Sequence, residues 1–507
     1  MKKNLCSHLP KIISVVTIFI LCISLSGCSA LFAGLVLKSP VQSAAAQHTT
    51  ALQIGQHDIS AVELNYFYID AITEYVNQYN SYIQFFMDVS KPLNDQVYDT
   101  ETGKTWADTF LDQAIESAKN TYALYDAAIA AGHTLSESEV SAMTQLYENM
   151  DTYAALYGYN DADQYLMAIY GTGATSSSYK LYYQAVVMAS SYYAAYAENL
   201  KDSYNDVTLR QFEGNEGYKY NSYSFSTIYL NADKFSSELD LRRAVTILAD
   251  SDNNTVEKLN AAIRDMEMEM LNVPSSGTFS TVTTQEDTLY SSINSLAQEW
   301  ISSDLREPGD ITCIDNKMDG ELKGVYVVLF HGVNDNRFAL ANVRHILIAY
   351  EGGTTNIATG ETVYTDEEKQ TARKEALKIY QQWLEGPKTE DNFAELARLF
   401  TDDSNADQGG LYEDIFPGQM VDAFNDWCFE PVRAAGDHII LEADYGWHIM
   451  YYSGDSETTY RNYMVANEKL TVDMDAWNKD LNENISCEVK NTSFINKEYI
   501  IEPNQIK

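Results

Sequence analysis

Apolar residues follow two different periods along this chain. From about residue 59 to about residue 206 they recur with the period of a helix, in a Tyr- and Ala-rich background with few β-branched clusters. Gly132 is of a type that commonly ends a helix, and Ser136 followed by Glu139 forms a capping box that starts the next one. The pattern predicts helices near residues 62–87, 106–131, 136–156, 162–170 and 177–203.

Residues 338–456 mix helical and strand-like periods in the order β-α-α-α-β-β. Thr365 and Glu368 form a capping box for the first helix, which Gly386-Pro387 ends. One face of that helix is apolar through Ala372, Ala376, Ile379 and Trp383. We expect the two further helices near residues 393–400 and 419–428, and the clearest strands at 343–348 and 446–450.

Residues 218–337 resemble the following segment in their spacing. Trp300 precedes Gly309-Asp310 by the same nine positions that separate Trp427 from Gly436-Asp437. We interpret this stretch as a degenerate copy of residues 338–456. The alternative is an unrelated α+β linker domain. The expected elements are a strand at 223–230, helices at 238–249 and 255–271, and a strand at 324–328.

The first 27 residues have the features of an export signal. Three lysines accompany an apolar run from Ile12 to Leu25, and Leu25-Ser26-Gly27-Cys28 resembles a bacterial lipobox. The resemblance implies that Cys28 is lipidated and becomes the mature N-terminus, followed by a tether over residues 28–50. An uncleaved signal anchor is the alternative. Both interpretations place most of the chain outside the cytoplasm, at the cell membrane.

Charge and cysteine content restrict the partners. Removing residues 1–27 takes away three lysines and no acidic residue, which changes the net charge from −39 to −42. Such a surface repels nucleic acid and anionic lipid, so we expect no nucleic-acid partner. Cys313, Cys428 and Cys487 are odd in number and widely spaced, and the eight histidines show no paired metal-ligand spacing. We therefore predict neither a metal nor a cofactor.

A series of short motifs between Val343 and Gly454 carries the chemistry. They are a strand containing His345, the loop Phe400–Ser404, Gly409-Gly410-Leu411, Gly418-Gln419-Met420 with Phe424, and a strand containing His448. Their order, spacing and residue types resemble a parvulin-type (PpiC, rotamase) peptidyl-prolyl cis/trans isomerase. The resemblance implies that residues 338–456 are the isomerase domain.

Prolyl isomerisation needs an apolar cup and a dry environment more than a nucleophile. The barrier of about 18–20 kcal/mol arises because twisting the amide breaks its resonance. Polar groups must favour the twisted state, and the site must withdraw water from the amide. Met420 and Phe424 are four residues apart in the expected third helix, so they are predicted to form the floor of the cup, with Leu411 as a wall. Ordinary helix packing is the alternative for both floor residues.

The two histidines are expected to form a dyad. Strand alternation places His345 with Val343 and Leu347 on one face, and the family pairs the strands of His345 and His448 side by side. A mutual hydrogen bond would then fix their tautomers. Asp403 stands where parvulins carry Cys or Asp near the dyad. Asp402 takes that role if the alignment slips by one, and a solvated acidic loop or a weak calcium site is the other interpretation of these carboxylates.

Two departures from the family pattern stand out. The usual Gly-Asp-Leu-Gly is Gly409-Gly410-Leu411-Tyr412 here, and the segment after His345 lacks the basic cluster of phosphate-selecting parvulins. We therefore do not expect specificity for phosphorylated Ser/Thr-Pro.

The N-terminal helical region carries a looser resemblance. Ile54–Ser60, followed by Glu63 and Tyr66, resembles the start of the helical chaperone domain in PrsA- and SurA-type foldases. In such foldases a C-terminal segment packs back on the N-terminal helices. The expected fold is α+β and multidomain: a helical chaperone-like domain (51–217), a degenerate parvulin-like unit (218–337), a parvulin domain (338–456), and a C-terminal helix and tail (457–507).

These features together imply a lipid-anchored foldase. It would isomerise X-Pro bonds and assist the folding of exported proteins, with unfolded or proline-containing exported polypeptides as partners and the membrane as its anchor. The alternative is a holdase chaperone whose parvulin-like units bind peptides without relevant turnover. A solute-binding lipoprotein is less favoured, because repeated βαβ patterns are not evident.

Overall fold

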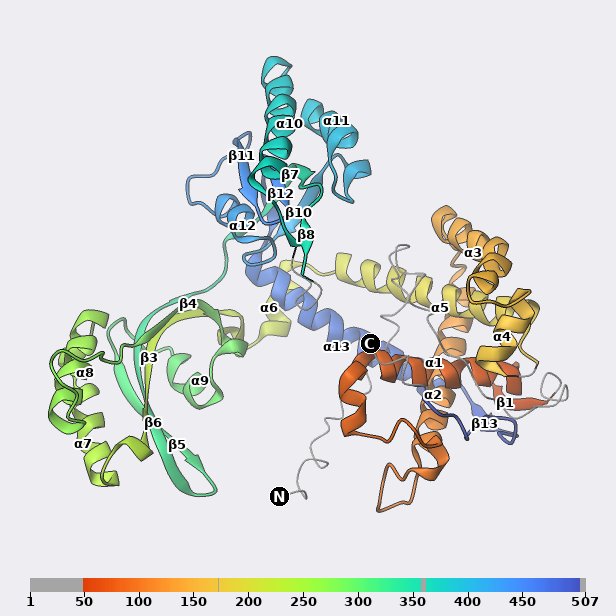
Figure 1. The fold of residues 1–507 in the computed structure, drawn as a ribbon, viewed down its shortest axis with the longest axis horizontal. Coiled ribbons are helices and arrows are strands. Elements are labelled where there is room, and N and C mark those ends of the chain that lie inside the picture. The colour runs from red at the N-terminus through yellow and green to blue at the C-terminus, as the bar shows by residue number, and fades with distance from the viewer. Residues whose placement is uncertain (1–48, 172, 357–361, 502–507) are drawn as a thin grey trace. The chain divides into compact units, whose positions relative to one another are not determined.

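The computed structural model describes residues 49–171, 173–356 and 362–501. The expected signal, Cys28 and most of the tether lie outside these residues. The described chain forms two compact units (Figure 1), one of which holds the chain up to Ser203 together with the chain from Leu470 onward, and the other Tyr204–Lys469. Within the described ranges, no helix combines the length and apolar character needed to cross a membrane.

The first unit is built mainly of helices, as the periodicity predicts. The box of Ser136 and Glu139 starts α3, and Gly132 ends α2 in the left-handed conformation with φ +67°. The first expected helix is shorter than predicted, because Asn80, at φ 41°, ends it and a 3₁₀ segment, Asn80–Phe85, follows. The helices are α1 (Ala61–Tyr79), α2 (Trp106–Ala131), α3 (Glu137–Leu156), α4 (Ala162–Tyr170) and α5 (Ser176–Asp202).

The C-terminal part of the chain completes this unit. Strand β1 (Thr50–Ile54) lies between β2 (His57–Ser60) and β13 (Cys487–Val489) in an antiparallel sheet. Leu52 is opposite Val489, so segments more than 400 residues apart in sequence share one ladder. The first unit is therefore discontinuous in sequence, with α13 (Tyr460–Asn484) leading into it.

The second unit contains a four-stranded antiparallel sheet in the order β10-β7-β12-β11. A strand, β10, lies between the second and third helices, where the sequence predicted none, so the element order is β-α-α-β-α-β-β. The sequence signal for β10 is weak, because the strand is only five residues long and contains Glu413 and Asp414. The elements are β7 (Ala339–Ala349), α10 (Asp366–Glu385), α11 (Glu390–Phe400), β10 (Leu411–Ile415), α12 (Asp422–Cys428), β11 (His438–Ala443) and β12 (Gly446–Thr459), with a small hairpin of β8 (Thr354–Thr355) and β9 (Thr362–Val363).

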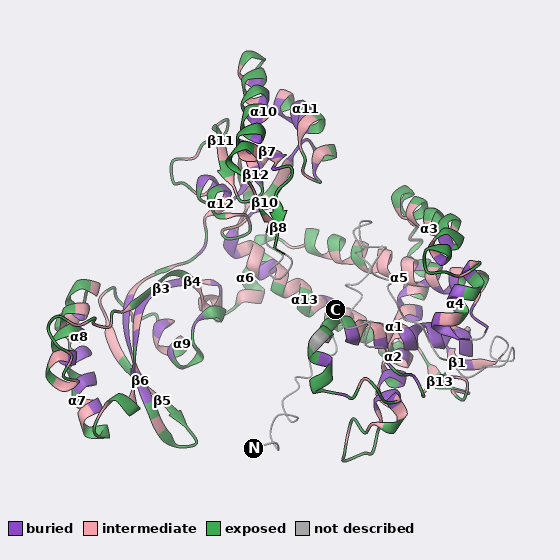
Figure 2. Cartoon of the chain, in the orientation of Figure 1, coloured by how far each residue is buried: buried purple, intermediate pink, exposed green. Residues whose placement is uncertain are grey.

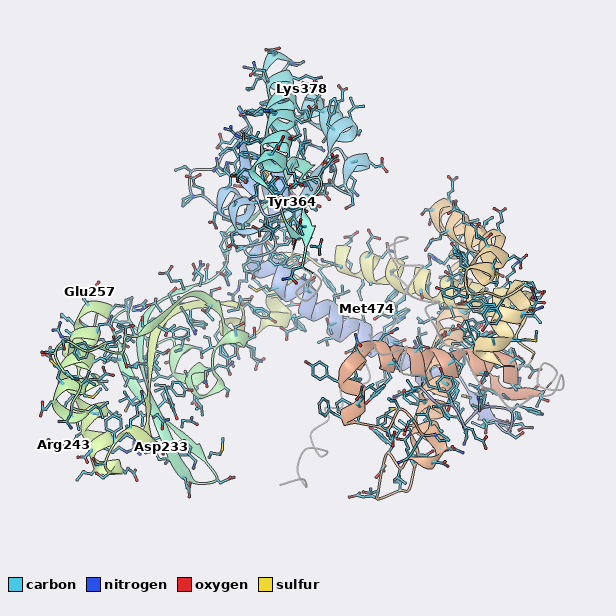
Figure 3. The ribbon with its side chains drawn as sticks, viewed as in Figure 1. Asp233, Arg243, Glu257, Tyr364, Lys378 and Met474 are labelled. Carbon is cyan, nitrogen blue, oxygen red and sulfur yellow. The ribbon has the colours of Figure 1, made fainter. Side chains whose placement is uncertain are left out.

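Alternation along β7 and β12 separates two apolar layers. Ile346 and Ile449 pack with the buried face of α10 and with α11, including Trp383. Val343 and Met450 point to the other face and pack with α12. Buried residues follow these inner faces in Figure 2, while charged side chains on the outer faces of the helices, such as Lys378 on α10, are exposed (Figure 3).

The residues before β7 form a second sheet with the same topology. Its order is β4-β3-β6-β5, which repeats β10-β7-β12-β11 element by element. Two helices again precede the edge strand and one follows it. The elements are β3 (Ser222–Asn231), α7 (Glu238–Leu248), α8 (Val256–Met270), β4 (Thr283–Leu289), α9 (Ser295–Ile301), β5 (Ile311–Met318) and β6 (Glu321–Asn334).

The two sheets also share a detail at the turn before their last hairpin. The amide of Gly309 donates to the carbonyl of Phe330 at 2.8 Å, and the amide of Gly436 donates to the carbonyl of Tyr452 at 2.8 Å. Each turn also stacks an arginine on the tryptophan that precedes it: the guanidinium lies 4.8 Å from the ring centre for Arg306 and Trp300, and 4.2 Å for Arg433 and Trp427.

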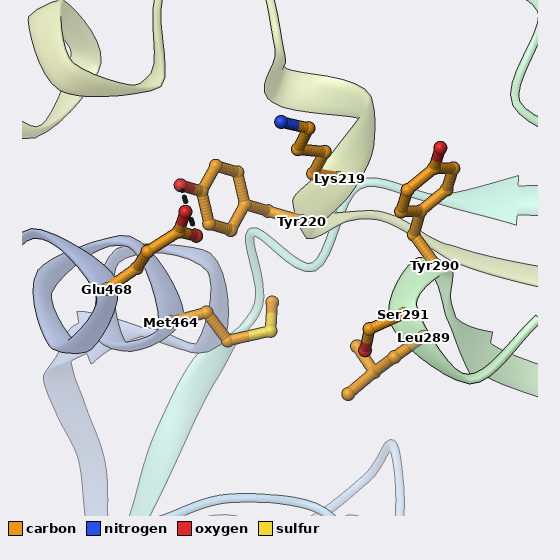
Figure 4. Close-up of a pocket in the computed structure, with 7 residues that line it drawn as sticks. All are labelled: Lys219, Tyr220, Leu289, Tyr290, Ser291, Met464 and Glu468. Carbon is orange, nitrogen blue, oxygen red and sulfur yellow. Dashed lines mark hydrogen bonds between the residues drawn. The ribbon is translucent and has the colours of Figure 1, made fainter. Parts of the chain in front are cut away.

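A buried arginine joins the segments between these two sheets. Arg461, 5% exposed, forms an ion pair with Glu213 at the end of α6 (Asp206–Glu213) and donates to Asn221 Oδ1 at 2.7 Å. It also donates to the carbonyl of Asp335, at 2.9 Å, in the link between β6 and β7. Two turns along α13 from this joint, the hydroxyl of Tyr220 donates to Glu468 at 2.8 Å (Figure 4).

We expect Arg461→Met to destabilise the second unit by about 3 kcal/mol, because removing one partner leaves the carboxylate of Glu213, only 14% exposed, without its cation. The measurement is the shift of the urea unfolding transition, followed by tryptophan fluorescence. Arg210→Met is the matched control. Its ion pair with Asp206 is exposed, so it should cost less than about 1 kcal/mol. Equal effects of the two substitutions would contradict the structural role given to Arg461.

Candidate functional site

The pairing of β7 with β12 brings the two histidines together. His345 is opposite Met450 and His448 is opposite Leu347, so the histidines are diagonal neighbours on one face of the sheet. Their Nδ1 atoms are 3.2 Å apart, and the rings are nearly parallel, at 15°. Both side chains are buried, with 3% and 5% of their surface exposed. The face predicted from strand alternation is confirmed.

Asp403 reaches this pair from the loop after α11. Its Oδ2 lies 2.6 Å from His345 Nε2. Thr401 holds the loop in place, because its Oγ1 accepts from the amides of both Leu347 and Asp403, at 3.0 and 3.2 Å. Asp402 has a different task, since its carboxylate accepts from the amide of Ala349 at 2.9 Å. The structure therefore places Asp403, and not Asp402, beside the histidines.

Tyr412 completes the hydrogen-bond chain and was not predicted as a site residue. Its hydroxyl donates to the same oxygen of Asp403 at 2.9 Å, and its ring centre is 5.2 Å from that of His345. The sequence signal was the tyrosine that stands where the family pattern has its second glycine. Burial, followed by this bond to the carboxylate, raises the pKa of Tyr412 to about 12, so the hydroxyl keeps its proton.

Leu411 lies on the other side of the sheet. It is opposite Arg344 on β7, whereas Tyr412 is opposite Val343, which shares its face with His345. Because cross-strand partners project from the same face, Leu411 does not form the wall of a cup above the histidines. The expectation for Leu411 is therefore corrected, and its neighbour Tyr412 occupies that place.

Phe424, predicted as part of the floor of the cup, covers both histidines. Its ring, 2% exposed, meets their rings edge-on at 5.4 Å from His345 and 5.9 Å from His448. Met420 is partly buried in the same apolar cluster. It is not on the same helix as Phe424, because α12 begins only at Asp422. The turn before α12 is fixed by Gly418, at φ +84°, whose amide donates to Asn425 Oδ1 at 2.7 Å.

The proton positions in this chain follow from charge. The hydrogen bond from His345, offset in part by burial, holds the pKa of Asp403 well below its usual range, so the carboxylate can only accept. His345 Nε2 must therefore carry the proton of that bond. When the His345 ring is neutral, its Nδ1 accepts from His448 Nδ1–H, which leaves His448 Nε2 as a bare acceptor. That atom is buried and has no hydrogen-bond partner among the described residues.

Burial also determines the charge of His448. It lowers the pKa of the imidazole to about 4, and the proximity of His345 lowers it in the same direction. The ring is therefore neutral at neutral pH. The arrangement is an apolar, water-poor site that contains the ionised carboxylate of Asp403, whose charge is satisfied by His345, Tyr412 and the amide of Ser404. In the described part of the chain, no group of three or more His, Cys, Asp or Glu side chains is placed to hold a metal ion.

Comparison with known families assigns this part of the chain. Residues 329–454 match the family model described as the PPIC-type PPIASE domain. These residues form a parvulin-type domain. The matched range contains the complete hydrogen-bond chain of Asp403, His345, His448 and Tyr412, together with Phe424. The parvulin-type resemblance inferred from the motifs is confirmed, while the exact limits of the domain, 338–456, stay a prediction.

Among solved structures, the chain is similar to the crystal structure of a peptidylprolyl isomerase (PrsA) from Bacillus cereus. The identity is 18% and the TM-score 0.18, over 32% of this chain and 57% of that one. The similarity thus spans little more than half the length of that protein. None of the curated proteins matches the chain.

The stability of the parvulin domain is expected to depend on pH through His448. Its pKa of about 4 in the folded state lies below the ordinary value of 6.5, so the unfolded chain binds the proton more readily. This contribution is fully present above pH 6.5 and is lost as the pH falls from 6.5 toward 4. Asp403, whose pKa is also lowered, adds a loss only below its ordinary value of 3.8.

We predict that His448→Gln flattens the dependence of the urea midpoint on pH between 6.5 and 4, while the steeper loss below pH 4 persists. Titration of the His448 ring by NMR should give a midpoint near 4. A midpoint near 6.5, or an unchanged slope in the variant, would show that the ring is solvated rather than buried beneath Phe424.

Proposed function

We propose that this protein is a peptidyl-prolyl cis/trans isomerase that assists the folding of exported proteins. The observation that supports the proposal is the continuous chain Tyr412–Asp403–His345–His448 beneath Phe424 in a parvulin-type domain. The isomerase part rests on the family match and on this geometry. The chaperone part and the place of action rest on the sequence.

The site has the properties that amide rotation requires. Rotation about an X-Pro bond passes through a state in which the amide has lost its resonance, and removal of water favours that less polar state. Met420, partly buried, supplies apolar surface for the pyrrolidine ring, and the buried ring of Phe424 keeps water from the histidines. We assign the hydrogen-bonding role to His448, His345 and Asp403. In the neutral arrangement above, His448 Nε2 is the unused acceptor of the chain.

We infer that residues 218–337 are a degenerate copy of the parvulin domain, without its chemistry. Gly324 is opposite Asn231 as Gly446 is opposite Ala349, and this shared register sets the equivalence of the two sheets. Counting from these pairs, Tyr326 stands in the place of His448 and Thr227 in the place of His345. Ala297 lies three residues before Trp300, and Phe424 lies three residues before Trp427, so Ala297 stands in the place of Phe424. The copy keeps the fold and has no histidine pair.

The location follows from the N-terminal sequence. The export signal and Cys28 support a bacterial lipoprotein held at the outer side of the cytoplasmic membrane, where folding clients arrive unfolded. Proline-containing exported polypeptides are the proposed substrates and clients. The helical unit that precedes the two sheets is the proposed chaperone domain.

A second candidate is a holdase that binds peptides without relevant turnover. The observation that favours it is the first copy, in which Thr227 and Tyr326 replace both histidines while the fold persists. A protein that keeps one parvulin-like unit without catalytic chemistry has a use for that unit other than catalysis.

We predict that His448→Ala and Phe424→Ala each reduce the isomerase rate of the full chain at least tenfold. The assay follows cis/trans exchange in a proline-containing peptide by NMR. His448→Ala removes the end of the hydrogen-bond chain, and Phe424→Ala opens the apolar cover to water. Because loss of a buried Phe costs about 3–5 kcal/mol, Phe424→Leu is made in parallel and near-UV circular dichroism verifies folding.

Tyr326→Ala is the matched control, because it alters the equivalent position of the first copy and should leave the rate unchanged. Rates that survive in the His448 and Phe424 variants would place catalysis elsewhere. Negligible exchange in the unaltered protein, with client aggregation suppressed equally by a His345→Ala/His448→Ala variant, would favour the holdase.

A further inference from the structure

A group of large apolar side chains is exposed on the loop that follows α1. Tyr82 and Phe85 expose 67% and 83% of their surface, and Phe86, Val97 and Tyr98 expose 47%, 56% and 41%. Isolated exposed apolar residues are common on proteins and need no explanation. These five lie within 17 positions of one another, and the rings of Tyr82 and Phe85 are in contact. We call them the 82–98 patch.

The loop that presents the patch is held in a defined shape. Asn80, with its positive φ, ends α1 and starts the 3₁₀ turn that carries Tyr82 and Phe85. The side chain of Gln96 then joins the two arms of the loop: it accepts from the amide of Asp88 at 2.7 Å and donates to the carbonyls of Asp88 and Lys91 at 2.9 and 3.0 Å. The backbone that carries the exposed rings is therefore held in a defined conformation.

A cavity of about 440 Å³ opens beside these rings. Its lining combines the apolar side chains of Phe85, Phe86, Val97 and Trp106 with the polar residues Gln84, Asp88 and Gln96. The ring of Trp106 is in contact with that of Tyr98 at 4.6 Å. Ligand pockets typically measure about 300–1,000 Å³, so this cavity suits one or two large side chains of a partner rather than a folded domain.

The charge around the patch is predominantly negative. Asp95, Asp99 and Glu101 lie next to Val97 and Tyr98 in sequence. The two lysines of this segment are already occupied, Lys91 by Asp88 at 2.9 Å and Lys104 by Asp112 at 2.5 Å. The surroundings are therefore anionic, which favours a cationic partner and repels an anionic membrane surface.

We propose that the 82–98 patch is a binding site for extended segments of unfolded polypeptides in which Lys or Arg residues alternate with large apolar ones. Apolar side chains of the partner fill the cavity beside Phe85 and Phe86, and its cationic side chains face Asp95 and Glu101. The proposed site specifies the chaperone part of the proposed function, and the choice of unfolded polypeptides as partners rests on that function. It does not require the parvulin site.

The test is fluorescence anisotropy of a labelled 15-residue peptide of alternating Lys and Phe, without proline, added to the full chain. We expect Tyr82→Ser/Phe85→Ser to weaken binding at least tenfold. Both side chains are largely exposed, so the fold should persist. Asp95→Asn/Glu101→Gln should weaken binding at least threefold and reduce its sensitivity to salt. The same peptide with Glu in place of Lys, or with Ser in place of Phe, should bind at least tenfold more weakly.

Leu156→Ser is the matched control, since Leu156 is 75% exposed in the same unit but outside the patch, and it should leave the affinity within twofold. The isomerase rate of every patch variant should equal that of the unaltered chain, which separates this proposal from the assignment of the parvulin site. Equal binding of the Tyr82/Phe85 variant, or equal affinity for the acidic peptide, would overturn the proposal. So would a patch-dependent binding to anionic lipid vesicles in place of the peptide.

Discussion

The pairing of β7 with β12 joins segments about a hundred residues apart, and the parvulin site exists only through it. His345 and His448 are 103 positions apart in sequence. The ladder fixes which residues face each other, and strand alternation then sends both imidazoles to the side covered by α12. The opposite side buries Ile346 and Ile449 against α10 and α11, so the register cannot slip by one residue without exposing that core.

Burial imposed by this packing defines the electrostatics of the site. A water-poor environment disfavours charge, and His448 responds with a lowered pKa, whereas Asp403 stays ionised because donors surround its carboxylate. The site thus holds the negative charge of Asp403 with assigned partners, beside the neutral imidazole of His448 and an aromatic ring. Such an environment suits a reaction whose barrier is the loss of amide resonance, since no group has to be charged or discharged along the way.

Sequence reasoning was accurate where one period governed the structure. The faces of His345 and His448 follow from alternation in two long strands. Asp403 was predicted from the resemblance to parvulins, with Asp402 as the alternative, and the structure places Asp403 beside His345. It was inaccurate at short elements. Strand β10 has only five residues and was not predicted. Without the strand, the direction of each side chain was undefined, and Leu411 was predicted in the place that Tyr412 occupies. Met420 was placed in a helix that begins two residues later, because a glycine with positive φ shapes the preceding turn. The sheet of β1, β2 and β13 depends on partners at opposite ends of the chain, which local periodicity does not reveal.

Comparison of the two sheets in the second unit distinguishes the residues that the fold requires from those that the chemistry requires. Both keep the strand order, the glycine turn and the arginine stacked on tryptophan, all of which stabilise the frame. They differ on the sheet face that α12 covers in the parvulin domain, where Thr227 and Tyr326 stand in place of the histidines. Loss of the buried polar chain costs the frame little, since apolar and hydroxyl side chains can fill the same face without leaving an unpaired charge. The frame therefore tolerates either set of residues, and the identity of a few inward-facing side chains decides whether such a unit can act on a prolyl bond or only contact a polypeptide.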